Sequence, residues 1–456
     1  MRILFYSTSS NTYDGKAIKT NTLPSWKEQW ESLAENHPEH QFIIATQLPG
    51  MFLLDLQENE IAQKSQKIEY HIIHSEKEKE IAMELSELKP DLAAALSFYV
   101  MPYDWLTVKD AMVADFLRDS GIKTICHTVE TGLICFDKWR THEFLEKTGI
   151  NCAKTVHLNH ELYINAGNRR ELTENVYTQA VFHEIKKLNF PLIIKDTTGL
   201  SSFGADVVNS YDEAVGILRS KKTTSDRTIE EMISGEQFGC EIYGTFDEKT
   251  GSGNYTILPP FKFSVNQYGI TSPKQSVKAG PFGCDEESSK KYRISELNEM
   301  LLKMANSLRL NGIAQVDLVF DGKKWFVIEI NPRLSGMSTT YASSAGLPLS
   351  KMIFNTLINS SQSTQILNFQ FSVNIKFPIL SEKRLFELKS LSCVAFVNQI
   401  ENKAAKQIRE QGYCEVIVCG NTKEELLENL LNLKEKFSDI CEAAFFETAD
   451  NMIKLL

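Results

Sequence analysis

Short apolar runs alternate with amphipathic stretches along the first part of the chain. The runs at residues 2–7 (RILFYS), 41–46 (QFIIAT) and 91–97 (DLAAALS) are typical of buried strands. Residues 26–36 and the stretch rich in Glu and Lys at 76–89 have helical character. This alternation predicts a parallel α/β sheet in about the first 130 residues. No GxGxxG follows the first strand, so the dinucleotide-binding fingerprint is absent.

The pattern then changes to a mixture of helices and shorter strands. Leu297, Leu301, Met304 and Leu308 recur at helical spacing, and Gly312 follows the end of that helix. The other expected elements are helices at 137–149, 211–219 and 423–437, and strands at 190–196, 205–209, 227–233, 371–377 and 414–418. The segment after about residue 365 therefore predicts a small α+β lobe.

Composition narrows the classes of protein that fit. A chain of 456 residues with 42% hydrophobic residues should fold into about two to four domains. The net charge of −10 argues against nucleic acid as a partner, which needs a basic surface. Nine cysteines without a CxxC pair favour reduced thiols. We find neither a signal peptide nor an apolar run near the roughly 18 residues that cross a membrane, and we expect a cytoplasmic protein without a membrane partner.

The most informative segment is 312–346, where two apolar strands flank a turn. Glu329 and Asn331, one residue apart at the end of the second strand, should point to the same face. Together with Asp317 on the preceding strand, they are hard oxygen ligands suited to Mg2+. A symmetric two-residue turn would put Asp317 on the face opposite Glu329, so the hypothesis requires a bulge or an odd-length loop. The alternative is a half-buried hairpin whose polar residues face water.

Two further segments contain candidate nucleotide-binding groups. Lys195 ends an apolar strand, and a loop rich in Gly and Ser follows it, which suits backbone N–H groups and an ammonium that contact phosphate. An ordinary hairpin explains the same residues. The strand edge at 230–233 (EEMI) could offer backbone groups to a purine, and a solvated acidic pair is the plainer explanation.

Taken together, the order and spacing of these segments resemble the ATP-grasp superfamily over about residues 130–350. The resemblance implies a metal site of Asp317, Glu329 and Asn331, holding one or two Mg2+ or Mn2+. It also implies that Arg333, Lys195 and Gly336 are catalytic. The nucleotide contacts that it implies are Lys138, Lys195, Ser201, Ser202, Gly204, Glu230, Glu231, Met232, Ile233 and Gln237. Many relatives have a glutamate where this chain has Gln237, so either Glu236 or Gln237 is a candidate for the ribose hydroxyls.

The resemblance also implies the reaction and the domain organisation. ATP would phosphorylate a carboxylate, and an amine would displace phosphate from the acylphosphate. Within the superfamily the chain looks most like the L-amino-acid ligase branch. The expected domains are a pre-ATP-grasp α/β domain (1–130), a small lobe with the phosphate-covering loop (131–235), a large lobe with the metal site (236–365) and a C-terminal α+β lobe (366–456).

Several alternatives remain open at this point. The expected partners are small-molecule carboxylates and amines, with amino acids favoured, while a carrier-protein acceptor and a homodimer are further options. A biotin-carboxylase-like or purine-pathway carboxylase would share the nucleotide site, and a nucleotide-binding regulator without turnover is a different class again. Lys262, Lys274 and Lys278 lie in or beside one loop, and any one of them could reach the γ-phosphate.

Overall fold

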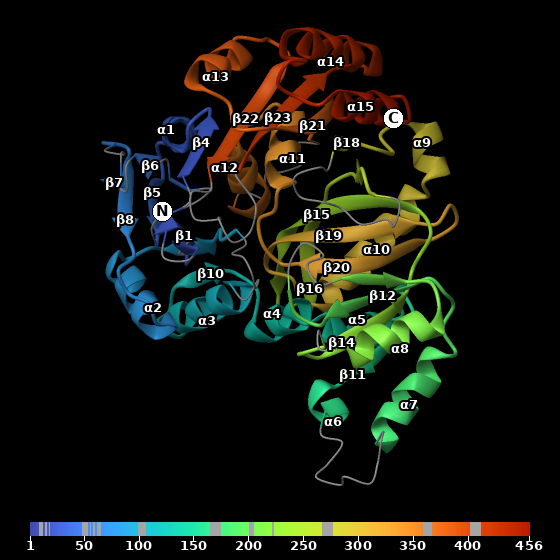
Figure 1. Ribbon diagram of the computed structural model, residues 1–456. Helices are drawn as coiled ribbons and strands as arrows, with labels where there is room; N and C mark the ends of the chain where they lie inside the picture. Colours follow the sequence, from blue (N-terminus) through green and yellow to red (C-terminus); the bar gives the residue numbers. More distant parts are fainter. Residues whose placement is uncertain are drawn as a thin grey trace.

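The structure is a computed structural model of the whole chain. It describes residues 1–8, 12–13, 16–17, 19–47, 53–54, 56–57, 60–61, 65–98, 106–164, 175–199, 205–220, 223–266, 277–358, 367–401 and 412–456. Figure 1 shows an N-terminal sheet beside a long central sheet, with a small lobe below and helices above.

Five parallel strands form the N-terminal sheet, in the order β10-β9-β1-β5-β8. These strands are β1 (Arg2–Ser7), β5 (Gln41–Thr46), β8 (Ile68–Ile72), β9 (Leu92–Ala95) and β10 (Lys123–Ile125), and the helices are α1 (Trp26–Asn36), α2 (Glu78–Glu87) and α3 (Leu106–Asp119). Phe5 packs with Trp30 of α1, whereas Tyr6 packs with Leu85 of α2, so helices bury both faces. The predicted parallel α/β fold is confirmed, and β1, α1 and β5 begin and end where expected.

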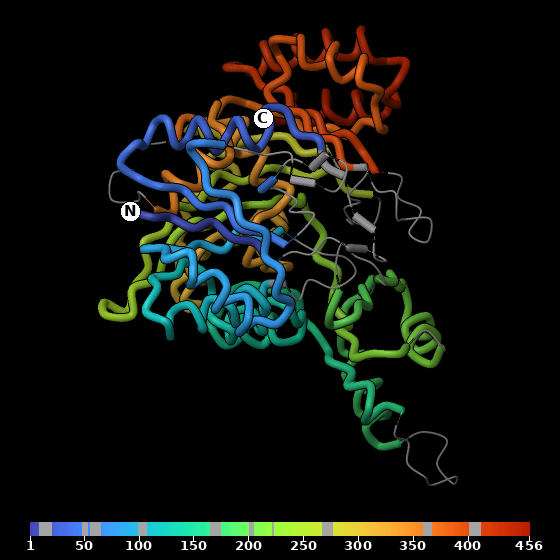
Figure 2. Tube along the Cα trace, turned by 90° about the vertical axis from the view of Figure 1, so that its left-hand side faces the viewer, coloured from blue at the N-terminus to red at the C-terminus, as the bar shows by residue number. Residues whose placement is uncertain are grey.

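A small antiparallel lobe follows, with the strand order β11-β14-β12-β13. Its elements are β11 (Thr155–Leu158), α6 (His160–Ile164), α7 (Val176–Ile185), β12 (Leu192–Asp196), β13 (Asp206–Val208), α8 (Tyr211–Arg219) and β14 (Arg227–Glu231). Ile185, Leu192 and Ile229 belong to its separate hydrophobic core. Figures 1 and 2 both show this lobe projecting from the rest of the molecule.

Two helices connect the N-terminal sheet to the small lobe. They are α4 (Val129–Phe136) and α5 (Lys138–Thr148). The Asp137 carboxylate caps α5 by accepting the N–H of Trp139 at 2.8 Å. Gly149 ends the helix in the left-handed conformation, with φ of 65°. These two signals explain why the helix occupies the predicted residues.

A ten-stranded sheet forms the centre of the molecule, and its neighbours run β20-β19-β15-β17-β18-β21-β23-β22-β4, with β16 beside β15. Its strands are β4 (Lys19–Leu23), β15 (Glu236–Asp247), β16 (Ser252–Ile257), β17 (Phe261–Phe263), β18 (Lys278–Gly280), β19 (Gly312–Phe320), β20 (Trp325–Asn331), β21 (Phe371–Phe377), β22 (Val394–Glu401) and β23 (Tyr413–Gly420). The C-terminal strands therefore continue the sheet that contains β19 and β20.

Helices cover one face of this sheet along most of its width. They include α10 (Ile294–Ser307), α14 (Lys423–Phe437) and α15 (Ala443–Ile453), whose apolar side chains share one core with Val316 and Val416. The other helices of this part are α9 (Glu286–Lys291), α11 (Ser338–Ser344), α12 (Leu349–Ile353), the π-helical turn Phe354–Ile358 and α13 (Glu382–Lys389). Among the residues that the structure describes, we find no helix long and apolar enough to cross a membrane.

Segments from the two ends of the chain meet at the edge of the central sheet. Strand β4 pairs antiparallel with β22, and the Thr22 hydroxyl donates to Asn398 Oδ1 at 3.1 Å. The partners are 376 residues apart in sequence. This pairing places the N-terminal sheet against the central one. Two short hairpins, Thr12–Tyr13 with Lys16–Ala17 and Leu56–Gln57 with Glu60–Ile61, complete the description.

Substitutions in the buried ion pair between Lys376 and Glu415 test how much this contact between β21 and β23 contributes to stability. Both side chains are almost inaccessible to solvent, at 6% and 5%. Lys376→Met should lower the free energy of unfolding by about 3–5 kcal/mol, because it leaves a buried carboxylate unpaired. The double variant Lys376→Met, Glu415→Gln should recover much of that loss. Urea unfolding measures both values, and equal losses in the two variants would contradict this account.

Candidate active site

Asp317 and Glu329 lie directly opposite each other on β19 and β20. The connection through residues 321–324 pairs Phe320 with Trp325, and that register alone would put Ile328 opposite Asp317. A bulge next to Asp317 shifts the pairing by one residue. The bulge is the irregularity that the metal-site hypothesis requires, and because of it the two carboxylates share one face.

A chain of polar contacts orders this face. The Gln315 amide donates to Asp317 Oδ1 at 2.6 Å, and the Asn331 amide donates to Gln315 Oε1 at 3.0 Å. The Arg333 guanidinium in turn donates to Asn331 Oδ1 at 3.1 Å. Gln315 was not among the predicted site residues. Its position two residues before Asp317, on the same strand face, is the signal that would have identified it.

The two carboxylates repel each other. Burial and the neighbouring charge of Glu329 raise the pKa of Asp317 to about 7, against the opposing effects of Gln315, Lys278 and Arg333. The described residues contain no cluster of three or more His, Cys, Asp or Glu side chains that could hold a metal. Mg2+ needs only one or two protein carboxylates when phosphates supply the other ligands. The donor set therefore fits Mg2+ bound together with a nucleotide.

A small cavity lies beside this set. It has a volume of about 10 Å³, and Gly199, Glu329 and Asn331 are among the residues that line it. That space is about enough for one water-sized group. Glu329 and Asn331 thus border a polar space that a small ligand can occupy.

Lys138 joins the small lobe to this carboxylate pair. Its ammonium donates to the Gly199 carbonyl at 2.9 Å and lies 3.6 Å from Glu329 Oε1. Its backbone N–H also donates to the Thr197 carbonyl at 2.7 Å. Lys138 is the first residue of α5, so the Asp137 cap positions it. The predicted lysine and the predicted carboxylate are therefore adjacent.

Lys195 at the end of β12 is the second cation of the cluster. Its ammonium donates to Glu230 Oε2 at 2.7 Å. Burial by itself lowers the pKa of Lys195, but Glu230, Glu329 and Asp317 outweigh it, and the net shift is upward. Lys195 consequently stays charged and contributes positive potential beside the two carboxylates.

The predicted adenine hinge lies at the end of β14. The N–H groups of Glu231 and Met232 donate to the carbonyls of Lys154 at 2.9 Å and Pro191 at 3.1 Å. Both N–H groups thus hold the strand in the small lobe. The binding of adenine by residues 230–233, Ile233 included, stays a prediction. Ser201, Ser202 and Gly204 of the phosphate-covering loop lie outside the described residues.

Strand register separates two pairs of candidates that sequence alone left open. Gly239 pairs with Asp317, and side chains alternate along β15, so Gln237 shares the Asp317 face while Glu236 points to the other. Lys262 pairs with Phe238, and its ammonium lies 3.1 Å from Glu236 Oε1 on that other face. These positions favour Gln237 over Glu236 as the ribose contact.

Lys278 lies on the Asp317 face of the sheet, opposite to the face of Lys262. It pairs with Phe263, whose ring lies against Gly239. Burial and the nearby Lys376 lower the pKa of Lys278 to about 8, against the opposing effects of Glu415, Asp317 and Glu241. Lys274 lies outside the described residues. Of the two loop lysines that can be placed, Lys278 is the one on the carboxylate face.

The turn after β20 is held by its own side chains. The Ser335 hydroxyl accepts the N–H of Met337 at 2.9 Å, and the Ser338 hydroxyl accepts the N–H of Ser335 at 3.1 Å. Both hydroxyls donate to the buried Glu241 carboxylate at 2.7 Å. The backbone N–H groups on both sides of Gly336 are therefore used within the turn.

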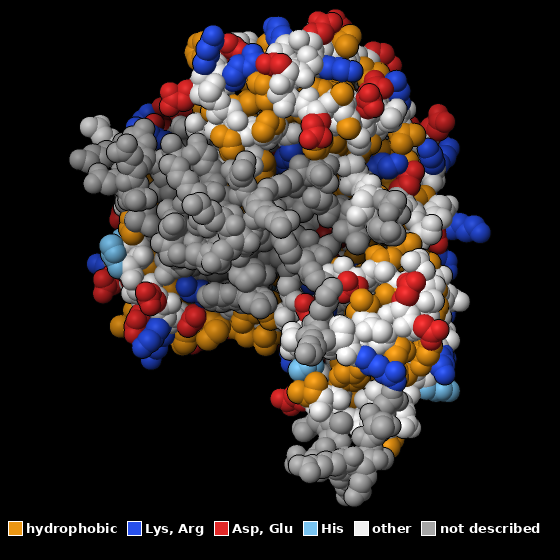
Figure 3. Space-filling view, in the orientation of Figure 1, with side chains coloured by type: hydrophobic (Ala, Val, Ile, Leu, Met, Phe, Trp, Pro, Cys, Tyr) orange, Lys and Arg blue, Asp and Glu red, His pale blue; other side chains and the backbone are white. Residues whose placement is uncertain are grey.

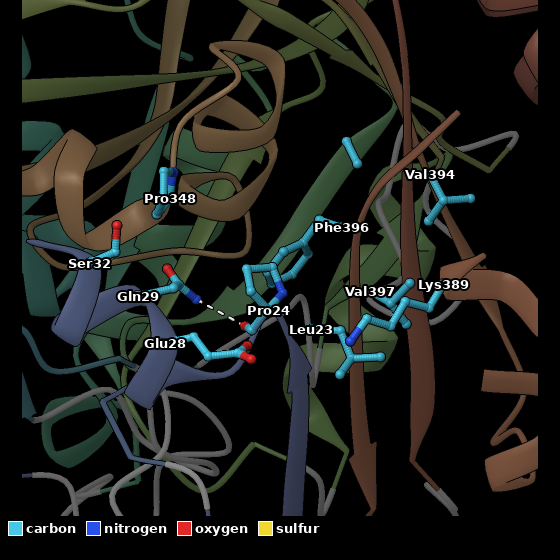
Figure 4. Close-up of a pocket in the computed structure, with 11 residues that line it drawn as sticks. Leu23, Pro24, Glu28, Gln29, Ser32, Pro348, Lys389, Val394, Phe396 and Val397 are labelled. Atoms are coloured by element: carbon cyan, nitrogen blue, oxygen red, sulfur yellow. Dashed lines mark hydrogen bonds between the residues drawn. The ribbon is translucent and has the colours of Figure 1, made fainter. Parts of the chain in front are cut away.

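Neither the surface nor the larger cavity is a strong alternative candidate for the active site. On the face in Figure 3, the described Lys, Arg, Asp and Glu side chains are interspersed without a patch of one sign. A cavity of about 590 Å³ lies between α1 and β22 (Figure 4). Leu23, Pro348 and Val397 give it largely apolar walls, and none of the predicted site residues lines it. It does not suit a triphosphate.

Comparison with known proteins supports the resemblance to ATP-grasp ligases. The family model for the D-ala D-ala ligase C-terminus matches residues 145–360. A D-alanine–D-alanine ligase of Buchnera aphidicola subsp. Schizaphis graminum is 24% identical over 257 residues, which are 55% of this chain and 77% of that protein. Residues 145–360 therefore match a family of ATP-grasp ligases, in the same part of the chain where the sequence resembles that superfamily.

Solved structures show that the ATP-grasp fold extends over nearly the whole chain. The crystal structure of an L-amino acid ligase from Bacillus licheniformis has a TM-score of 0.63 and 16% identity, and the match covers 96% of this chain and 98% of that one. An N5-carboxyaminoimidazole ribonucleotide synthetase from Thermotoga maritima has a TM-score of 0.58 and 14% identity, with 95% and 98% covered. The predicted fold class and family are confirmed.

These findings also establish the class of reaction. The chain is an ATP-grasp ligase of the carboxylate–amine type. Enzymes of this superfamily use ATP and Mg2+, and small carboxylates and amines are their typical substrates. The roles of the individual site residues remain predictions, with the geometry described above as their physical basis.

The repulsion between Asp317 and Glu329 leads to a test by pH. Because the folded pKa of Asp317, about 7, lies above its unfolded value, the stability that its proton confers is lost as pH rises from about 4 to about 7. Asp317→Asn cannot titrate, so in EDTA its Tm relative to wild type should increase over that range. Mg2+ with ADP should then raise the Tm of wild type more than that of the variant.

The matched control is Asp321→Asn in the loop between the same strands. Backbone N–H groups of Lys324 and Lys323 lower the pKa of Asp321, so this substitution should lower the Tm at neutral pH. A Tm difference for Asp317→Asn that is flat from pH 4 to pH 8 would show that the carboxylates do not repel each other.

Proposed function

We propose that this ATP-grasp ligase joins two amino acids through an acylphosphate, with release of ADP and phosphate. The observation that carries the proposal is the alternation of charge at one site. Glu329 lies between the ammonium of Lys138 and the carboxylate of Asp317, and Lys195 with Glu230 lies beside them. Phosphoryl transfer depends mainly on alignment and on neutralising charge, which such a cluster supplies.

The chemistry needs two displacements. An oxygen of the donor carboxylate attacks the γ-phosphorus of ATP, the bond to the β-phosphate oxygen breaks, and ADP leaves. The amine nitrogen of the acceptor then attacks the acyl carbon, the C–N bond forms, phosphate leaves, and the nitrogen loses a proton. Each displacement moves negative charge onto phosphate oxygens, so cations fixed beside the phosphates favour both.

Asp317, Glu329 and Asn331 would hold Mg2+. When bound, this ion supplies charge neutralisation at the phosphate oxygens. Lys138 and Lys195 would contact the phosphates from the small-lobe side. Each now has a carboxylate neighbour, Glu329 for Lys138 and Glu230 for Lys195, and so each ammonium is held at the site before nucleotide arrives.

Arg333 would bind the donor carboxylate and then the acylphosphate. Its guanidinium already donates to Asn331 Oδ1, which places it next to the proposed metal set. A planar fork matches the two oxygens of a carboxylate. The resemblance of nearly the whole fold to an L-amino acid ligase supports amino acids as both substrates.

The reaction itself is the first test. ATP consumption should require both a carboxylate donor and an amine acceptor, and a panel of amino acids should yield an amide product with ADP and phosphate. Release of AMP and pyrophosphate would contradict the acylphosphate route. Turnover with bicarbonate alone as the carboxylate would show a carboxylase instead, and turnover only with a protein-bound group would show a carrier-directed ligase.

Arg333→Lys tests the carboxylate contact. Lysine keeps the charge but loses the two-pronged geometry, so the KM for the donor amino acid should rise about tenfold or more. The KM for ATP should change little. Initial-rate kinetics with each substrate varied in turn measure this, and Arg309→Lys, at an exposed pair with Glu248, is the control. A rise in the KM for ATP alone would place Arg333 at the nucleotide.

A further inference from the structure

Lys278 is a cation with no carboxylate partner in the part of the chain that the structure describes. Its ammonium donates to the Gly336 carbonyl at 3.2 Å and lies 5.6 Å from the centre of the Phe263 ring. No Asp or Glu oxygen of the described residues lies within ion-pair distance of it, and its side chain is only partly exposed. Removing an ammonium from water without a counter-ion is costly, so such a group is usually opposite an anionic ligand.

Three carboxylates act on the charge of Lys278, those of Glu415, Asp317 and Glu241. Asp317 lies opposite Glu329 and accepts the Gln315 amide, and the other two are also engaged. Glu415 is paired with Lys376 and also accepts the Asn374 amide at 2.7 Å. Glu241 accepts three hydroxyl groups, those of Tyr243, Ser335 and Ser338, each at 2.7 Å. Neither is free to turn toward Lys278, and so the described residues do not supply an anion for it.

The position of Lys278 in the sheet indicates which part of a bound ligand it faces. Lys278 shares the face of Asp317 but is three strands away along the order β19-β15-β17-β18, about 14 Å between backbones. Lys138 approaches the carboxylate pair from α5 and Lys195 from the small lobe, whereas Lys278 comes from the side of the C-terminal strands. It therefore reaches this face from a different side than Lys138 and Lys195, beside the Gly336 carbonyl.

Charge identifies the substrate group. When two amino acids condense, the donor carboxylate and the acceptor amine are consumed at the acyl carbon. The unreacted groups are the ammonium of the donor and the carboxylate of the acceptor. A fixed cation repels the first and attracts the second.

We propose that Lys278 binds the α-carboxylate of the acceptor amino acid and so selects free amino acids over acceptors whose carboxyl group is blocked. This assignment rests on the proposed ligase function. It makes Lys278 a specificity-determining residue of β18, opposite Asn374 of β21. The Gly336 carbonyl, at 3.2 Å, holds the ammonium of Lys278.

The test uses matched acceptors that differ only at the carboxyl group, such as alanine and alaninamide or methionine and methioninamide, in both configurations. For wild type, kcat/KM should be about tenfold or more higher for the acid, as expected for a hydrogen bond between charged groups. Lys278→Met should lower kcat/KM for the acid by a similar factor and leave the amide almost unchanged. Lys278→Arg should restore part of the preference.

The control is Lys291→Met, which removes another lysine whose ammonium lies over an aromatic ring, here Tyr292 at 5.0 Å. It should keep the wild-type preference. If Lys278→Met fails to fold, the ratio of acid to amide in wild type decides, because the proposal requires it to exceed one by a wide margin.

The outcomes separate this inference from the proposed function. Wild type that ligates acids and amides equally well would overturn the role of Lys278 while the ligase function stands. Equal losses with both acceptors in Lys278→Met, accompanied by a raised KM for ATP, would place Lys278 at the phosphates instead. A wild type that forms no amide from any pair would refute the ligase proposal and this assignment with it.

Discussion

One extra residue in β20 decides whether two acidic side chains of the central sheet share one face. Without the bulge at Ile328, the register set by the Phe320–Trp325 pair would turn Glu329 and Asn331 toward the hydrophobic core. The bulge brings Glu329 opposite Asp317 and leaves Val327 and Ile330 in the core. The cations around the carboxylates offset a concentrated negative charge, which exists only because the bulge brings these two acids together.

The polar residues of the site belong to one continuous sheet face. Asn331 and Glu329 of β20, Asp317 of β19 and Lys278 of β18 all project from it, and Lys376 of β21 extends the row. The opposite face packs on α10, α14 and α15. A helix-backed sheet thus holds groups of opposite charge at fixed spacing, and α5 and the small lobe add Lys138 and Lys195.

Local signals in the sequence were enough to predict much of the fold. Helices α8 and α14 and strand β21 begin and end at the expected residues, because caps such as Ser210 and Thr422 and regular apolar spacing define them locally. Strand order could not be predicted in this way. That the strands after residue 365 continue the sheet of β19 depends on contacts between distant segments, which no local pattern records.

The same limit applies to the site. The types and spacing of Asp317, Glu329 and Asn331 pointed to a metal, but whether they share a face depended on a bulge. The sequence indicated that a metal site would need such a bulge, and it did not show that the bulge was there. Sequence could not choose between Lys262 and Lys278, or between Glu236 and Gln237, because the choice depends on which face each strand presents. Register made those distinctions.

The pairing of β4 with β22 has a consequence for synthesis of the chain. Lys19–Leu23 leaves the ribosome hundreds of residues before Val394–Glu401, the strand with which it pairs. Domains commonly fold from the N-terminus as they emerge, and the N-terminal parallel sheet can do so. Strand β4 cannot, because its backbone partner does not yet exist. The newly made protein must therefore keep an unpaired strand out of other contacts until the last fifth of the chain arrives, and a late block in translation would leave that edge exposed.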